Sequence, residues 1–274
     1  MDIRFVGITS RKQLNPEITD ALISILKKYG IDYSFELLPS SDDGLYRKAD
    51  LILSMGGDGT LLSSVAKAGL YGKPVMGINL GNLGFLSELE RDELSGMEKL
   101  FKGEYSIDER MMIECSFKSG NERLTFHCLN DSIVSRGTFP RMIKSKVYVS
   151  GNLAEEYTSD GIIVATPTGS TAYSLSAGGP IVSPGLDIMT ITPICPHSLN
   201  SRSLVVGGEE EIEIEINEEY NSRFFVSNDG RENMAASGRV FIKKSRYTAK
   251  LIRVSNDNFY SILHKKLTER GGEF

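Results

Sequence analysis

A glycine-rich segment at Ser54–Thr60 constrains the fold of this chain more than any other stretch. Its sequence is SMGGDGT; an apolar run, residues 49–53, enters it and a run with helical character, Leu61–Ala68, leaves it. This order predicts a strand, a tight turn and a helix. The glycines allow a ligand to approach the backbone closely, and the first turn of the helix offers unpaired N–H groups to an anion.

Asp58 lies in the middle of this segment. A carboxylate beside bound phosphates is electrostatically unfavourable unless a metal ion or a substrate proton requires it. The residue therefore suggests phosphoryl transfer, with Asp58 as a general base or as a partner of the metal. The alternative at this point is a plain structural corner, in which the glycines serve only the turn and Asp58 caps the helix.

The first hundred residues alternate between strand and helix patterns. Strands are predicted at residues 3–8, 33–37, 51–55 and 74–78, and helices at residues 16–29, 60–68 and 92–101. Such alternation predicts an α/β domain with a mostly parallel sheet, in which ligands bind beyond the carboxyl ends of the strands. The Gly56–Thr60 turn follows the third strand there, and a second glycine-rich loop, Asn79–Leu86, follows the fourth. We therefore expect both loops to face one crevice, which favours the ligand-binding interpretation.

From Met111 onward the pattern changes to short strands separated by turns. They are predicted at residues 112–117, 124–128, 133–135, 143–149, 162–165, 211–216, 240–243 and 249–254. The simplest architecture is a C-terminal β-rich, sandwich-like domain at residues 104–254. A closing helix is indicated by the spacing of Phe259, Ile262, Leu263, Lys266 and Leu267. We expect it to return to the first domain, which then comprises residues 1–103 with residues 255–274 packed on it.

Charge and cysteine content narrow the function classes. The chain has 274 residues and a formal net charge of −5, so it has no broad electrostatic attraction to nucleic acid or to an anionic membrane. Cys115, Cys128 and Cys195 lack any CxxC spacing and are interpreted as free buried thiols in a reducing cytosol. No apolar run approaches the roughly 20 residues that span a bilayer, and no signal peptide is recognised. The sequence predicts a soluble, cytoplasmic protein.

Three further segments, and the absence of some common motifs, bear on the function. Asn130-Asp131, between two predicted strands, forms either an ordinary turn or a hydrogen-bonding pair for ribose hydroxyls or a nucleobase. Thr166–Thr171 concentrates hydroxyl groups and N–H donors before a short helix predicted at Thr171–Ala177, which suits a polar ligand. The alternating glutamates at residues 211–216 are interpreted as a solvated strand face rather than a metal site. The sequence shows no Ser–His–Asp arrangement, zinc-ligand spacing or GKS/GKT loop.

Taken together, these motifs resemble the NAD kinases, the ATP- or polyphosphate-dependent enzymes that make NADP. The resemblance covers residues 3–267 and rests on the glycine–Asp–glycine turn, the Gly77–Leu86 segment, Asn130-Asp131 and the Asp160–Pro180 stretch. The glycine–Asp–glycine turn alone is shared with lipid kinases of the diacylglycerol type and with 6-phosphofructokinases. The Thr166–Ser176 segment is the part that resembles NAD kinases specifically.

The resemblance implies roles for particular residues. Asp58 is expected to be the general base on the 2′-hydroxyl of the adenosine ribose. The backbone of Gly56, Gly57, Gly59 and Thr60 is expected to bind phosphates. Asn130 and Asp131 are expected to hold the adenosine end of NAD, and Asp160 its nicotinamide end. The remaining residues expected to line the NAD site are Asp58, Gly59, Arg141, Thr171, Ala172, Tyr173, Ser174, Leu175 and Ser176.

The resemblance also implies partners. NAD and ATP or polyphosphate are the expected substrates, and Mg²⁺ is expected to bind with the donor, because no dedicated carboxylate cage is visible. The expected assembly is a homodimer or homotetramer. A lipid or sugar kinase that uses the same glycine turn is the alternative enzyme, and a non-catalytic dinucleotide-binding protein is the alternative outside catalysis.

Two positions depart from the family pattern. The pair that is usually Asn–Glu is Asn130-Asp131 here, so its reach to the ribose differs or needs a water molecule. After Asp229-Gly230, where many members carry Gln, this chain has Arg231, which suggests a phosphate contact and leaves the role of that position open.

Overall fold

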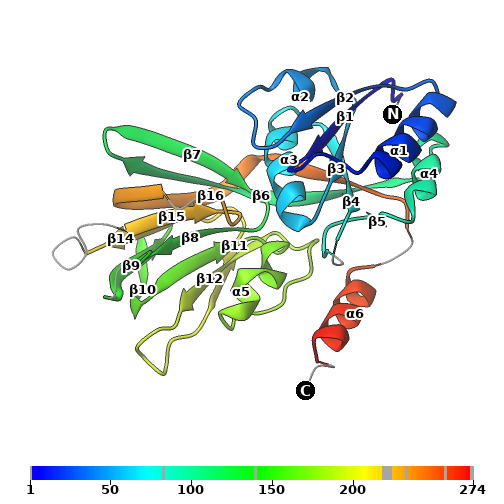
Figure 1. Cartoon of the computed structure of the whole chain (residues 1–274). Helices are drawn as coiled ribbons and strands as arrows, with labels where there is room; N and C mark the ends of the chain where they lie inside the picture. The colour runs from blue at the N-terminus through cyan, green and yellow to red at the C-terminus, as the bar shows by residue number, and fades with distance from the viewer. Residues whose placement is uncertain are drawn as a thin grey trace. The chain divides into compact units, whose positions relative to one another are not determined.

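The computed structural model describes residues 2–81, 84–138, 141–217, 224–231, 234–255 and 258–271. The chain divides into two compact units (Figure 1). Unit 1 comprises Met1–Glu109 and Ala249–Phe274, and unit 2 comprises Arg110–Thr248. Two long strands, β6 (Ser106–Ser119) and β16 (Met234–Arg253), contribute residues to both units.

Unit 1 contains a parallel sheet in the order β2-β1-β3-β4. Its strands are β1 (Phe5–Ser10), β2 (Asp32–Leu37), β3 (Leu51–Met55) and β4 (Pro74–Asn79), and β4 also pairs with β5 (Leu89–Glu90) and with the end of β16. Every residue of β3 and β4 is buried, as expected of central strands covered on both faces. The parallel α/β fold predicted for the N-terminal part is confirmed.

Helices pack against both faces of this sheet. The helical elements of unit 1 before residue 109 are α1 (Pro16–Lys28), α2 (Gly44–Lys48), α3 (Asp58–Leu70), a 3-10 turn η1 (Leu94–Gly96) and α4 (Met97–Phe101). The C-terminal helix α6 (Phe259–Gly271) lies apart from the sheet (Figure 1). Leu22 and Leu26 of α1 pack with Leu51 and Leu53 in one core cluster. Because neighbouring strand residues point to opposite faces, Ile52 faces the other side, where Gly7 leaves space for Leu45 of α2.

Helices α1, α3 and α6 agree with the sequence pattern, and the helix predicted at residues 92–101 differs from it in form. Asn15 caps α1 by accepting the N–H of Glu17, and Pro16 occupies the first turn, as predicted. The closing helix α6 forms and belongs to unit 1, also as predicted. The helix predicted at residues 92–101 begins two residues later, as the 3-10 turn η1, and continues directly into α4; Gly96, where the two meet, has helical backbone angles.

Unit 2 is β-rich, and its strand pairs are antiparallel. Two series of strands, β13-β12-β11-β8-β15-β16 and β10-β9-β14-β16, share β16. Besides β6 and β16, the strands are β7 (Glu122–Cys128), β8 (Asp131–Ser135), β9 (Ile143–Val149), β10 (Asn152–Ser159), β11 (Gly161–Ala165), β12 (Ile188–Ile194), β13 (Leu204–Gly207), β14 (Ile212–Ile216) and β15 (Phe224–Asn228). Two short helical pieces, η2 (Gly169–Thr171) and α5 (Tyr173–Ser176), follow β11. The predicted β-rich C-terminal fold is confirmed.

Three details of this part differ from the sequence predictions. Residues 240–243 and 249–254 were predicted as separate strands, but β16 is continuous, because it pairs in turn with β15, β14 and β4 along its length. The glutamates of β14 are not simply solvated: Glu213 and Glu215 are partly buried and both pair with Arg239. Cys115 and Cys128 are buried free thiols as expected, whereas Cys195 is exposed.

No helix within the described part of the chain combines the length and apolar character needed to cross a membrane.

Candidate active site

The turn between β3 and α3 is built around two glycines. The N–H of Gly56 donates to the carbonyl of Ile78 on the neighbouring strand at 2.9 Å. A Cβ on Gly56 would lie 2.5 Å from Oγ1 of Thr60, and its φ of 153° is one that side chains rarely adopt. Gly57 is the cap residue and Asp58 is the first residue of α3, so the alternative in which Asp58 caps the helix is not what forms.

Asp58 is held by the second glycine loop. The N–H of Phe85 donates to its Oδ2 at 2.9 Å and the N–H of Leu86 to its Oδ1 at 3.3 Å. A Cβ on Gly84 would lie only 2.2 Å from Oδ1, so this position requires glycine. The two glycine-rich loops are therefore in contact; that both face one crevice stays a prediction. Each carboxylate oxygen has further lone pairs, so Asp58 remains able to accept a proton.

Three buried hydroxyl groups next to this turn are hydrogen-bonded to one another. Thr9 Oγ1 lies 2.8 Å from Ser64 Oγ, and Ser64 lies 3.1 Å from Ser54 Oγ. All three residues are almost completely buried, so the bonds tie β1, β3 and α3 together.

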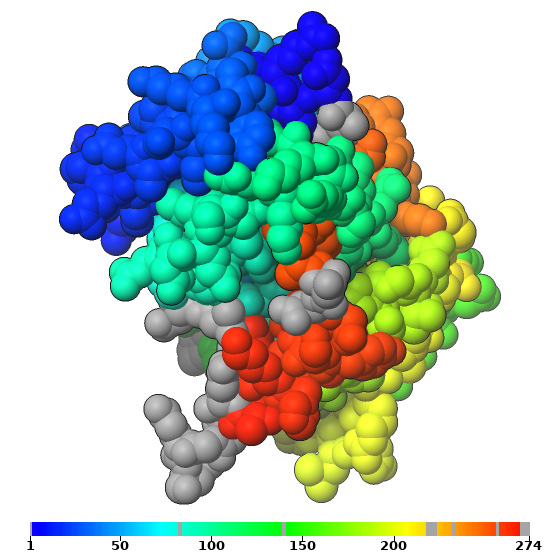
Figure 2. All heavy atoms as spheres, turned by 90° about the vertical axis from the view of Figure 1, so that its right-hand side faces the viewer, coloured from blue at the N-terminus to red at the C-terminus, as the bar shows by residue number. Residues whose placement is uncertain are grey.

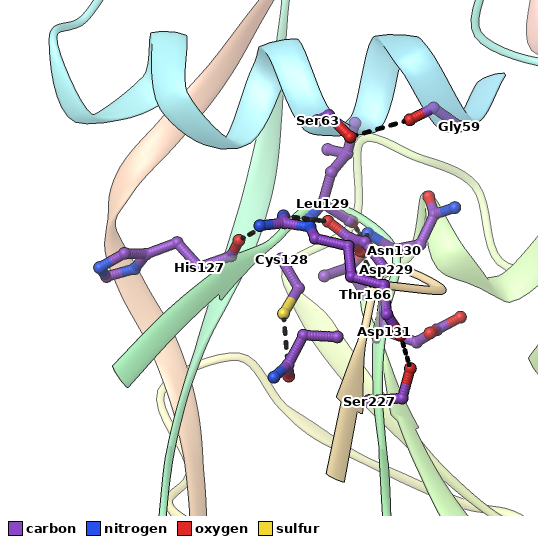
Figure 3. A network of polar contacts seen from close by, with 12 residues as sticks. Gly59, Ser63, His127, Cys128, Leu129, Asn130, Asp131, Thr166, Ser227 and Asp229 are labelled. Carbon is purple, nitrogen blue, oxygen red and sulfur yellow. Dashed lines mark hydrogen bonds and ion pairs between the residues drawn. The ribbon is translucent and has the colours of Figure 1, made fainter. Parts of the chain in front are cut away.

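Arg11 adds a positive charge at the start of α3. Its Nη2 donates to the carbonyl of Gly59 and to Ser63 Oγ, each at 3.0 Å. Figure 3 shows the further bond from the Ser63 hydroxyl to the Gly59 carbonyl. A cation at a helix N-terminus opposes the helix dipole unless an anion is present. The guanidinium is therefore suited to a bound anion. Sequence reasoning missed Arg11, because the loop after β1 carries no recognisable motif.

A buried carboxylate organises the corresponding turn in unit 2. Asp229 accepts the N–H groups of Leu129, Asn130 and Asp131 at 2.9, 2.8 and 3.2 Å (Figure 3). Its own N–H donates back to the carbonyl of Asp131 at 3.0 Å. Its side chain is fully buried, and its φ of 51° places it in a tight turn with Gly230. Asp229 thus fixes the backbone of the Asn130-Asp131 pair.

The hydroxyl-rich segment Thr166–Thr171, which follows β11, is hydrogen-bonded to the same Leu129–Asp131 turn. Thr166 donates from Oγ1 to the carbonyl of Leu129 at 2.5 Å and from its N–H to the carbonyl of Asn130 at 2.9 Å. A Cβ on Gly169 would lie 2.0 Å from the Asn130 carbonyl oxygen, so only glycine fits. Two motifs that are about 35 residues apart in the sequence therefore form one structure. The Oδ1 atom of Asn130 is buried and has no hydrogen-bond partner among the described residues.

Burial changes the electrostatics of this turn. Burial, and next the charge of Asp229, raise the pKa of Asp131 to about 7. Burial also raises the pKa of Asp229, opposed by the charge of Arg231 and by the three N–H donors. Arg231 Nη2 lies 3.5 Å from Asp229 Oδ2 and is in reach of the His127 carbonyl, so this departure from the family pattern supplies a counter-charge within the turn.

The other predicted NAD residues have distinct environments. Asp160, at the start of β11, pairs with Arg136 at 2.7 Å. Tyr173 is 45% exposed and so is not part of the core, whereas Ser174 is fully buried with its hydroxyl 3.3 Å from that of Thr192. The helix predicted at Thr171–Ala177 is two shorter pieces, η2 and α5, with Ala172 between them. Arg141 is exposed just before β9.

Within the described residues, no cluster of three or more His, Cys, Asp or Glu side chains is arranged to hold a metal ion. Sequence reasoning also missed Asp229 as an organising residue. Its only sequence signal is the Asp-Gly dipeptide of a turn.

A parallel α/β unit with a carboxylate inside a glycine turn, in one chain with a β-rich unit that holds a rigid polar turn, is the arrangement expected of the kinases that the sequence motifs resemble. Two family descriptions match the chain: the ATP-NAD kinase N-terminal domain over residues 33–105 and the ATP-NAD kinase C-terminal domain over residues 129–254. The chain belongs to the NAD kinase family.

Known proteins agree with this assignment. An NAD kinase of Caldanaerobacter subterraneus subsp. tengcongensis is 42% identical over 273 residues, which covers 94% of this chain and 96% of the relative. An NAD kinase of Thermoanaerobacter sp. is 46% identical over 230 residues, which covers 82% and 81%.

Two solved structures have the same fold. A yeast NADH kinase complexed with NADH has a TM-score of 0.84 and 25% identity, covering 99% of this chain and 89% of its own. An NAD kinase from Archaeoglobus fulgidus in complex with ATP has a TM-score of 0.80 and 25% identity, covering 96% and 98%. The chain is thus an enzyme that phosphorylates NAD, and nothing favours the lipid- or sugar-kinase alternative.

Proposed function

We propose that this enzyme transfers a phosphoryl group from ATP to the 2′-hydroxyl of the adenosine ribose of NAD, with Asp58 as the general base. The observation that carries the assignment is the Asp58 carboxylate, oriented by the N–H groups of Phe85 and Leu86 beside a glycine turn of phosphate-binding type. A ribose hydroxyl is a poor nucleophile, so a carboxylate within hydrogen-bond reach accepts its proton as the new bond to phosphorus forms. Such help contributes about 10²- to 10⁴-fold in rate.

The donor is assigned to unit 1. Phosphoryl transfer depends mainly on positioning and on neutralising charge. The backbone of Gly56, Gly57, Gly59 and Thr60 and the guanidinium of Arg11 supply both. Mg²⁺ is proposed to bind with the donor phosphates and to neutralise their charge, in keeping with the absence of a carboxylate cluster among the described residues.

NAD is assigned to unit 2. Asn130 and Asp131 are proposed to hold the adenosine end, and the unpartnered Oδ1 of Asn130 supports this role because it can accept a ligand N–H or O–H. Asp160 is proposed to bind the nicotinamide end, with Arg141 and Thr171–Ser176 lining the rest of the site. Tyr173, exposed on α5, is available to stack on a flat ring.

A homodimer or homotetramer is proposed as the working assembly. Several large apolar side chains of unit 2 are exposed along one stretch of sequence: Tyr173, Ile181, Leu186, Leu199 and Val205. Such side chains favour burial against another surface. The buried free thiols Cys115 and Cys128, together with the use of ATP, support the cytoplasm as the place of action.

The test is product formation by the purified protein. With NAD, ATP and Mg²⁺ we expect NADP, and we expect no product when the acceptor is the NAD analogue that lacks the adenosine 2′-hydroxyl. Polyphosphate in place of ATP and NADH in place of NAD then establish the donor and acceptor ranges. Failure to form NADP with either ATP or polyphosphate would contradict the proposal, and so would phosphorylation of the 2′-deoxy analogue.

A further inference from the structure

A buried lysine lies on the apolar face of the C-terminal helix. Lys266 occupies a position that the helical spacing of Phe259, Ile262 and Leu263 assigns to an apolar residue, and it is only 6% exposed, whereas its neighbour Lys265 is exposed. Its Nζ lies 4.1 Å from the centre of the Phe85 ring. A buried lysine is stabilised only by specific contacts, and the ring of Phe85 is one of the contacts that Lys266 makes.

The helix that carries Lys266 begins at a well-defined cap. Oδ1 of Asn258 accepts the N–H of Ser261 at 3.0 Å, and Ser261 Oγ accepts the N–H of Asn258 at 3.1 Å. This reciprocal pair fixes the first turn of α6. Figure 2 shows α6 in red at the surface. Lys266 therefore lies on a helix whose first turn is fixed by side-chain capping.

Phe85 links Lys266 to Asp58. The ring of Phe85 lies beneath the ammonium group, and the backbone N–H of the same residue donates to Asp58 Oδ2 at 2.9 Å. A cation over an aromatic ring attracts its electron-rich face and restricts its movement. Movement of this residue would move one of the two donors that orient the carboxylate.

The strand end that precedes α6 holds the same loop. The side chain of Glu88 accepts the N–H groups of Val254 and Ser255 at 2.7 and 2.6 Å. Arg253 pairs with Glu88 at 3.1 Å and donates to the carbonyl of Leu86 at 3.4 Å. Residues 85–88 are therefore held by the C-terminal segment at both their side chains and their backbone.

We propose that Lys266 is a positioning residue for phosphoryl transfer, which acts through Phe85 to hold Asp58 in its reactive orientation. The proposal rests on the proposed role of Asp58. It assigns a catalytic purpose to α6, which contributes none of the residues expected to touch either substrate.

The test uses four variants of the full-length enzyme. Lys266→Met keeps the length of the side chain and removes its charge, and we expect kcat to fall about tenfold while KM for NAD and ATP stays within about twofold, since small displacements of a reacting group are costly. Lys266→Arg keeps a cation over the ring and should restore most of kcat. Lys265→Met is the matched control and should leave kcat unchanged. Phe85→Leu removes the ring and should lower kcat to a similar extent.

The double variant Lys266→Met/Phe85→Leu separates positioning from general destabilisation. If both residues act through one contact, its kcat is no lower than that of the worse single variant; independent effects would multiply. A wild-type kcat for Lys266→Met, failure of a folded Lys266→Arg to restore activity, or multiplicative losses would each overturn the proposal. If Asp58→Asn keeps its activity, the proposed function fails instead, which the Lys266 variants alone would not show.

Discussion

At the scale of single residues, Gly84 is the position at which an added side chain would most directly disturb Asp58. The ideal Cβ position at this glycine is 2.2 Å from Asp58 Oδ1 and 3.0 Å from Ser87 Oγ. We therefore expect Gly84→Ala to displace the carboxylate and to lower kcat by about 10²-fold, with the circular dichroism spectrum of the fold retained. Steady-state NADP formation measures the loss.

Gly81→Ala, in the same loop, is the control. A Cβ there meets nothing within 4 Å, so this variant should keep its kcat. Equal activity of the two alanine variants would show that Asp58 does not depend on the close approach of Gly84.

Asp131 makes the free energy of unfolding depend on pH, and its raised pKa determines the direction of that dependence. Its pKa is about 7 in the folded protein and 3.8 as the ordinary value, so the folded state binds the proton more tightly. The stability that this group contributes is fully present below about pH 4 and is lost as the pH rises toward 7. Asp131→Asn removes this loss, so at pH 8 we expect the variant to be more stable by roughly 1–4 kcal/mol.

Urea denaturation of both proteins at pH 5 and pH 8 measures the effect. Because the charge of Asp229 contributes to the raised pKa of Asp131, the difference between wild type and variant reports on the coupled pair of carboxyl groups. If the free energy of unfolding changes by the same amount between pH 5 and pH 8 in wild type and in Asp131→Asn, the raised pKa assigned to Asp131 is contradicted.

Single residues were predictable where local sequence carries the signal. Asp58 stands out because a carboxylate inside a glycine turn needs a reason. Asp229, Arg11 and Lys266 do not stand out, because their partners are about 48 or more positions away and each looks like an ordinary turn, loop or surface residue. Their meaning depends on tertiary contacts that a pattern of spacing cannot give.

At the scale of elements, Glu88 ties the second glycine loop to the end of β16. Its side chain is only 3% exposed and bonds Arg253 and two backbone N–H groups. Glu88→Gln removes one of the two carboxylate charges that pair with the largely buried guanidinium of Arg253. The remaining ion pair is the longer one, to Asp108 at 3.3 Å. We expect a loss of about 2–4 kcal/mol in the free energy of unfolding, measured by chemical denaturation.

Asp108→Asn provides the comparison for this prediction. Asp108 bonds the same guanidinium but has 30% of its side chain exposed, so its loss should cost under about 1 kcal/mol. If Glu88→Gln lowers the free energy of unfolding less than Asp108→Asn does, the buried contacts of Glu88 are not the more stabilising ones and the prediction is wrong.

The elements were predictable where burial and alternation are strong. The buried strands β3 and β4, the capped helix α1 and the alternating β14 follow from their sequences. The 20-residue β16 does not, because it passes from one sheet series to another near Gly238, whose φ is 73°, and its polar middle imitates a loop. Such a strand is stabilised by pairing partners distant in the sequence.

At the scale of the whole molecule, the proposed assembly is open to direct measurement. We expect sedimentation velocity at micromolar concentration to show two or four protomers, because the exposed apolar side chains around α5 and β13 favour a partner surface. Leu199, which is 92% exposed, is the position at which a substitution by Asp should weaken association. A single protomer at this concentration would contradict the proposal.

The role of Asp58 as the general base is the central claim, and Asp58→Asn tests it most directly. The amide keeps the size of the side chain but cannot accept the ribose proton. We predict that the variant binds NAD with an affinity close to wild type, measured by titration calorimetry, and that its kcat falls by about 10²- to 10⁴-fold. A purified, folded variant that keeps more than about a tenth of the wild-type kcat would contradict the claim.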